Sequence, residues 1–97
     1  MRKIFITNGV KENLDLRALI SIIRKIRMKE SREIGNEIDG FQVFEFKKNQ
    51  MKNIQEFPNQ IDVVELDYEI KDCNIWAVIG LDKNIGEYWT IMYPNEY

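Results

Sequence analysis

The segment DVVELDYEIKD, residues 62–72, decides the fold class that the sequence predicts. Carboxylates stand at alternate positions, Glu65, Asp67 and Glu69, and apolar or aromatic residues stand between them. A period of two is typical of a strand with one buried face and one solvent-exposed face. We therefore expect a strand whose carboxylates face water and whose residues 64, 66, 68 and 70 face the core.

Further strands are predicted on both sides of this segment. KIFIT (3–7) is a short β-branched run, closed by Asn8-Gly9, a dipeptide that favours a turn. GFQVFEFKK (40–48) and QMKNIQEF (50–57), separated at Asn49-Gln50 and stopped by Pro58, predict a hairpin. CNIWAVIGL (73–81) and GEYWTIMY (86–93), which flank the loop DKNI and end at Pro94, predict a second hairpin.

One amphipathic helix is predicted from Asp15 onward, with Asn13 or Asp15 as its N-cap. Its apolar stripe contains Leu16, Leu19, Ile20, Ile23 and Ile26, and Ile22 widens it. Arg27 and Glu30 would fall inside this stripe. We therefore expect the helix beyond Ile26 to project into water and the basic run 24–29 to be exposed.

The order of one strand, one helix and four or five strands predicts a single α+β domain over residues 1–97, with the helix packed on a mainly antiparallel sheet. One helix covers one face of the sheet, yet the strands after residue 73 are apolar or aromatic on both faces. Either loops or a second copy of the chain cover the other face, or its aromatic residues form a contact surface. These residues are Trp76, Tyr88, Trp89 and Tyr93.

The composition lacks most residue combinations that common catalytic sites require. The chain has no histidine, one cysteine (Cys73), two serines and five scattered glycines, so the parts of nucleophilic triads, common zinc sites and nucleotide loops are missing. Same-face residues of a strand lie about 6.8 Å apart, so Glu65, Asp67 and Glu69 do not converge on one metal ion. We expect a non-enzyme without metal or cofactor; a hydrolase with paired carboxylates is the weakest alternative.

The lengths of the apolar stretches also predict where the protein resides. No stretch approaches the roughly 20 apolar residues of a membrane span, and the N-terminal apolar run is too short for a signal peptide. We expect a cytoplasmic protein without membrane contact.

Charge is divided unevenly along the chain. Residues 1–52 carry 12 Lys/Arg and 7 Asp/Glu, whereas residues 53–97 carry 2 and 9. The acidic row of Glu65, Asp67 and Glu69, extended by Asp62 and Asp72, is either a solvated strand face or a surface that imitates a nucleic-acid backbone and docks on a basic partner.

The basic helix supports a rival prediction, a small nucleic-acid-binding module. Its cations within residues 17–32 are Arg17, Arg24, Lys25, Arg27, Lys29 and Arg32. Glu30 and Glu33 interrupt the run, which is also compatible with a solvated face.

Motifs at both ends and in the middle carry a family resemblance. IFITNGV, DGFQVFEF, IQEFP and EYWTIMYPNEY, in this order, resemble domain-of-unknown-function family 960, small proteins of low-GC Gram-positive bacteria and their mobile elements. The matching residues are Thr7, Gly9, Val10, Gln42, Val43, Phe44, Glu45, Gln55, Glu56, Pro58, Tyr88, Thr90, Met92, Glu96 and Tyr97. The longer basic helix and the acidic segment 62–72 depart from the pattern. The resemblance implies a compact α+β domain, and it implies no catalytic residues.

Together these features predict a non-enzymatic protein-binding domain. In its specific form it is a phage- or plasmid-type accessory protein that inhibits a host nucleic-acid enzyme or defence complex, like an anti-CRISPR protein, through its acidic surface. The alternatives are the nucleic-acid-binding module and a structural, self-associating domain, for instance a homodimer.

Overall fold

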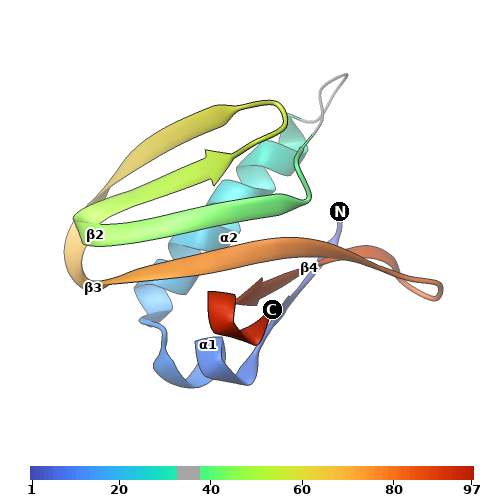
Figure 1. Cartoon of the computed structure of the whole chain (residues 1–97), viewed down its shortest axis with the longest axis horizontal. Coiled ribbons are helices and arrows are strands. Elements are labelled where there is room, and N and C mark those ends of the chain that lie inside the picture. Colours follow the sequence, from blue (N-terminus) through green and yellow to red (C-terminus); the bar gives the residue numbers. More distant parts are fainter. Residues whose placement is uncertain (33–37) are drawn as a thin grey trace.

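Four strands form one mixed sheet in the computed structural model, which describes residues 1–32 and 38–97 (Figure 1). The elements are β1 (Lys3–Ile6), α1 (Asn8–Asn13), α2 (Leu16–Ser31), β2 (Phe41–Gln55), β3 (Gln60–Asp82), β4 (Gly86–Met92) and a 3-10 helix, η1 (Pro94–Glu96). The strand order is β1-β4-β3-β2; β1 runs parallel to β4, and the other two pairs are antiparallel. The prediction of one α+β domain, with one main helix on a mostly antiparallel sheet, is confirmed.

The chain leaves β1 through a helix, so the turn predicted at Asn8-Gly9 is wrong. Thr7 is the N-cap of α1, and its Oγ1 accepts a hydrogen bond from Val10 N at 3.3 Å. A threonine in this place satisfies an amide that would otherwise be free at the start of a helix. Asp15 caps α2 in the same way, as one of the two predicted caps, by accepting from Arg17 N at 2.9 Å.

The buried side of α2 differs from the predicted one. Ala18, Ile22, Lys25 and Ile26 are buried, whereas Leu16 is 66% exposed and Ile20 is 40% exposed. The apolar residues of α2 extend around more than one side of the helix, and the sheet covers the side centred on Ile22. The core side is therefore rotated from the predicted stripe by roughly a third of a turn.

The C-terminal part of α2 packs against the protein, so the prediction that it projects into water is wrong. Lys29 Nζ donates hydrogen bonds to Gln42 Oε1 at 2.8 Å and to Gln55 Oε1 at 3.1 Å. The basic run is thus only partly exposed, and Lys25 within it is 9% exposed.

β2 and β3 form one long hairpin that doubles back on itself, as Figure 1 shows. The two short strands predicted over 40–57 are one strand, and both of its halves pair with β3 rather than with each other. The bend lies at Lys48, which has a φ of 55°, and the pairing shifts on both sides of this residue. The Asn53 side chain links the two halves of β2, since its Nδ2 donates to Gln42 Oε1 at 3.1 Å and to the backbone carbonyl Val43 O at 3.2 Å.

The segment 62–72 is extended, as predicted, and it continues without interruption into residues 73–82. The hairpin predicted between β3 and β4 is also confirmed. The core lies between α2, the sheet and the folded-back part of the hairpin, and its buried members are Val10, Ala18, Ile22, Ile26, Phe44, Phe46, Met51, Ile75, Ala77, Trp89 and Ile91.

Candidate protein-binding groove

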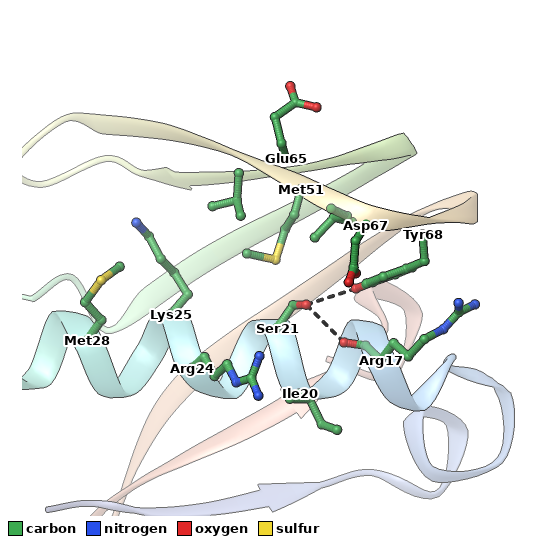
Figure 2. A pocket seen from close by; sticks show the side chains of 12 residues that line it. Arg17, Ile20, Ser21, Arg24, Lys25, Met28, Met51, Glu65, Asp67 and Tyr68 are labelled. Carbon is green, nitrogen blue, oxygen red and sulfur yellow. Dashed lines mark hydrogen bonds between the residues drawn. The ribbon is translucent and has the colours of Figure 1, made fainter.

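A groove with a volume of about 570 Å³ lies between α2 and the folded-back part of the β2–β3 hairpin (Figure 2). Its lining comprises Arg17, Ile20, Ser21, Arg24, Lys25 and Met28 from α2, Met51 from β2, and Val64, Glu65, Leu66, Asp67 and Tyr68 from β3. The helical residues recur every three or four positions, so one side of α2 follows the groove. From Arg17 to Met28 this side extends for about 16 Å.

The bend in the hairpin creates the groove. Asn49 is the single β2 residue between Lys48, which pairs with Ile70, and Gln50, which pairs with Glu65. The β3 residues between those two partners, 66–69, therefore bulge from the ladder. This bulge carries Leu66, Asp67 and Tyr68 to the groove wall opposite α2.

The helix brings an exposed apolar stripe to this groove. Ile20 is 40% exposed and Met28 is 37% exposed, and Leu16, one turn before Ile20, is 66% exposed. In Figure 2, Ile20 points away from the folded-back hairpin, and Arg24 extends along the exposed side of the helix, so both lie at the outer edge of the helical wall. α2 is thus apolar on a core side and on a second, solvent-exposed side.

Hydrogen bonds fix the end of the groove near the start of α2. Ser21 Oγ lies 2.9 Å from Tyr68 Oη and donates to Arg17 O at 3.0 Å (Figure 2). The Arg17 guanidinium stacks over the Tyr68 ring at 4.5 Å from the ring centroid and donates to Asp15 Oδ2 at 2.7 Å. Hydrogen bonds from Arg17 lower the pKa of Asp15 below its ordinary value.

The acidic row keeps its predicted exposure pattern. Glu65, Asp67 and Glu69 are exposed, and the residues between them are half-buried. Within residues 1–32 and 38–97, none of these three carboxylates lies within 4.0 Å of a cationic group. Glu65, which points away from α2 in Figure 2, accepts a hydrogen bond from Gln50 Nε2 at 2.8 Å. The row is therefore an exposed line of negative charge that borders the groove.

The two residues proposed to extend the row differ in their surroundings. Asp62 turns toward α2, where its Oδ2 lies 3.1 Å from Lys25 Nζ. Asp72 is exposed and lies beyond the bulge, beside Cys73. Asp62 is thus half-exposed and paired with Lys25, and the carboxylates of the row without an ion pair are Glu65, Asp67 and Glu69.

Most cations of the basic helix have partners inside the protein. The contacts are Arg17 with Asp15, Lys25 with Asp62, Arg27 with Glu30, and Lys29 with Gln42 and Gln55. Arg24 and Arg32 are exposed and form no ion pair in the described part of the chain. The helix accordingly presents two separate free guanidinium groups instead of a continuous basic stripe. Glu33, predicted to interrupt the run, lies outside the described residues.

A buried polar network anchors Lys29 beside the groove. Gln42 and Gln55 are buried, and Gln42 Nε2 donates to Gln55 Oε1 at 2.8 Å while Lys29 Nζ donates to both side chains. Burial lowers the pKa of Lys29 below its ordinary value. The sequence pattern missed this network because a lysine in a basic run shows no local sign of its two glutamine partners, 13 and 26 residues away.

Trp89, predicted among the contact aromatics, is a core residue instead. Its side chain is fully buried, and its Nε1 donates to Glu30 Oε2 at 3.1 Å. Glu30 also accepts hydrogen bonds from Arg27 at 2.7 Å and from Arg2 at 3.3 Å. This set closes the core at the C-terminal end of α2.

The other predicted aromatics are partly exposed. Trp76 packs against Phe41 and Tyr97, with ring centroids 4.8 and 5.7 Å away. The Tyr88 ring covers Gly80, where a Cβ atom would lie 2.5 Å from it. Tyr93 is half-buried and packs on the core. Trp76 and Tyr88 lie on strands of the main sheet and are absent from the groove lining.

The two ends of the chain meet at Glu96. Its carboxylate accepts hydrogen bonds from Thr7 Oγ1 at 2.6 Å, Tyr93 N at 2.8 Å and Gly9 N at 3.2 Å. A Cβ atom on Gly9 would lie 2.6 Å from Glu96 Oε2, so the close approach requires glycine. Motif residues from both ends of the sequence thus share one structural contact.

Within the described ranges there is no cluster of three His, Cys, Asp or Glu side chains suited to hold a metal ion. Burial, aided by the charge of Asp72, raises the pKa of the Cys73 thiol, which disfavours the nucleophilic thiolate.

None of the described helices is long and apolar enough to span a membrane.

Comparisons of the chain with protein-family models, curated proteins and solved structures gave no match. The resemblance to domain-of-unknown-function family 960 therefore stays a prediction from the sequence.

Proposed function

We propose that the chain is a non-enzymatic protein-binding domain that holds part of a partner protein in the groove between α2 and β3. One observation carries this proposal: the groove is lined by exposed Ile20 and Met28 on α2 and, on β3, by Glu65 and Asp67, carboxylates without an ion-pair partner among the described residues. An apolar centre bordered by charge is the common composition of protein interfaces. A volume of about 570 Å³ is within the range of binding pockets and suits a few anchoring side chains.

The distribution of charge favours a protein partner over nucleic acid. A phosphate-binding face needs several free cations close together, and four of the six candidate cations have internal partners. The carboxylates of the row, by contrast, remain available. Their exposure favours basic side chains in the partner.

A more specific form of the proposal is an inhibitor of a nucleic-acid enzyme or defence complex. Such a partner has a basic surface for the phosphate backbone, and the exposed carboxylates at alternate positions, Glu65, Asp67 and Glu69, suit that surface. Binding there would exclude the nucleic acid.

The test is affinity capture from a bacterial lysate with three forms of the protein. These are the parent, the row variant E65K/D67K/E69K, and a control, E12K/E45K/E56K, which makes the same change in charge away from the groove. Circular dichroism and thermal unfolding establish that each variant is folded. The proposal requires that the parent and the control capture the same protein and that the row variant loses it.

Equal capture by the row variant would reject the acidic surface. If the parent instead retains a nucleic acid, with an affinity that falls with salt and is lost in Arg24→Glu, the nucleic-acid alternative replaces the proposal.

A further inference from the structure

We infer that the partner segment in the groove is an amphipathic α-helix of about three turns, with acidic side chains along one flank and basic side chains along the other. This inference rests on the proposed function, and it specifies the partner at the same site.

The apolar lining sets the length and the form of this segment. Ile20 and Met28 are exposed at helical spacing along α2, and the groove side of α2 is about 16 Å long. A helix of about 11 residues spans that length. Its own i, i+3/i+4 and i+7 side chains pack as ridges into the grooves of α2, which an extended strand does not provide.

The opposite wall supplies complementary apolar contacts. Met51, Val64 and Leu66 line it, and Met51 points from β2 toward α2 in Figure 2. Met28 is 37% exposed and adapts its shape to an incoming side chain at low cost, whereas Met51 is 1% exposed and forms the buried base of the opposite wall. These residues form an apolar floor between the two lips.

Charge complementarity fixes the flanks of the partner. The lip on α2 carries Arg24, an arginine without an ion-pair partner among the described residues, and the lip on β3 carries Glu65 and Asp67. A segment with one sign of charge on both flanks would meet repulsion at one lip. A helix with segregated flanks meets opposite charge at both lips.

Three synthetic 14-residue peptides with the same leucine stripe test this inference. The first has Glu on one flank and Lys on the other; the second has the same composition with Glu and Lys mixed on both flanks. The third is the first with a central proline, which disrupts a helix. Titrations follow the ¹³C-methyl signals of methionine, because Met28 and Met51 line the groove whereas Met1 and Met92 do not.

A double variant, R24E/D67K, reverses the charges of Arg24 and Asp67 on the two lips without changing net charge. The matched control K11E/E12K exchanges two exposed residues of α1 and also keeps net charge. An unchanged Met92 signal shows that each variant keeps its fold, because Met92 is 8% exposed and packs in the sheet.

The expected result is that the segregated peptide shifts Met28 and Met51, binds about tenfold more tightly than the mixed peptide, and loses this preference in R24E/D67K but not in K11E/E12K. Equal binding of the mixed peptide overturns the charge assignment. If the proline peptide binds as tightly as the segregated peptide, the occupant of the groove is extended and the helix is wrong. Shifts of Met28 and Met51 on concentrating the protein alone show a second copy, and no shift with any peptide rejects a helix at this site.

Lysate capture separates these failures from failure of the proposed function. If capture still depends on the row Glu65, Asp67 and Glu69 while the peptides fail, the protein-binding proposal stands and the helical partner is wrong.

Discussion

The ammonium group of Lys25 lies 3.1 Å from a carboxylate oxygen of Asp62, and this contact joins the basic and acidic halves of the chain. The side chain of Lys25 is 10% exposed and that of Asp62 is 47% exposed. The uneven charge of the sequence is therefore partly neutralised within the fold. Glu65, Asp67 and Arg24 line the groove and form no ion pair among the described residues.

The two partners of this ion pair should respond differently to substitution. Asp62→Asn leaves a buried ammonium without its carboxylate, and we expect a loss of about 1–3 kcal/mol in the free energy of unfolding. Lys25→Met places an apolar chain in the same space and leaves Asp62 accessible to water, so its loss should be within about 1 kcal/mol. Urea unfolding measures both, with Asp67→Asn as the control. A larger loss from Lys25→Met would contradict this account of the pair.

Local patterns predicted most of the secondary structure and failed where distant contacts decide. The alternation in 62–72 and the turn between β3 and β4 are short-range signals, and both are confirmed. The bend at Lys48 resembles a hairpin turn in sequence, yet the two halves of β2 pair with β3. The sequence of residues 40–57 does not show that both halves pair with β3, because β3 begins only at Gln60, after this segment.

The groove itself was beyond prediction from the sequence. The acidic row and the basic helix were both identified, but their position on facing walls depends on the bulge at residues 66–69. The apolar residues of α2 extend around the helix, so periodicity did not determine which side is buried. Exposed Leu16 and Ile20, predicted to be core, were therefore missed as candidates.

The two tryptophans should report on different environments. In Trp76→Phe, the remaining Trp89 is fully buried and hydrogen-bonded to Glu30, so its fluorescence should be blue-shifted and protected from acrylamide. In Trp89→Phe, the remaining Trp76 is half-buried and should be quenched more strongly. The second substitution should also cost about 1–3 kcal/mol of stability, since it opens space in the core and removes a donor to Glu30. Equal quenching of the two variants would contradict the burial of Trp89.

Glu30 should make stability fall in acid. Burial raises the pKa of Glu30, but hydrogen bonds from Arg27, Trp89 and Arg2 outweigh it and hold the pKa below its ordinary value of 4.5. A carboxyl whose pKa is lower in the folded state contributes stability above its unfolded pKa and loses it as pH falls through the folded value. Glu30→Gln should therefore be less stable than the parent at pH 7, and the difference should shrink below about pH 4.5.

Urea unfolding over a pH series tests this dependence. The control, Glu12→Gln, changes an exposed carboxylate of α1 that has no ion pair in the described part of the chain. Its difference from the parent should stay small at every pH. A constant difference between Glu30→Gln and the parent would show that the ionised form of Glu30 does not contribute as proposed.

Glu96 should protect amides at both ends of the chain. Its carboxylate accepts from Gly9 N and Tyr93 N, and the hydrogen bond from Thr7 Oγ1, with these two amides, lowers the pKa of Glu96. Glu96→Ala leaves the two amides without their acceptor, so hydrogen exchange at Gly9 and Tyr93 should accelerate. Gly9→Ala should have a similar effect at Tyr93, because its Cβ atom would displace the carboxylate. Glu12→Ala is the control, and unchanged exchange in both test variants would show that Glu96 does not hold the two ends together.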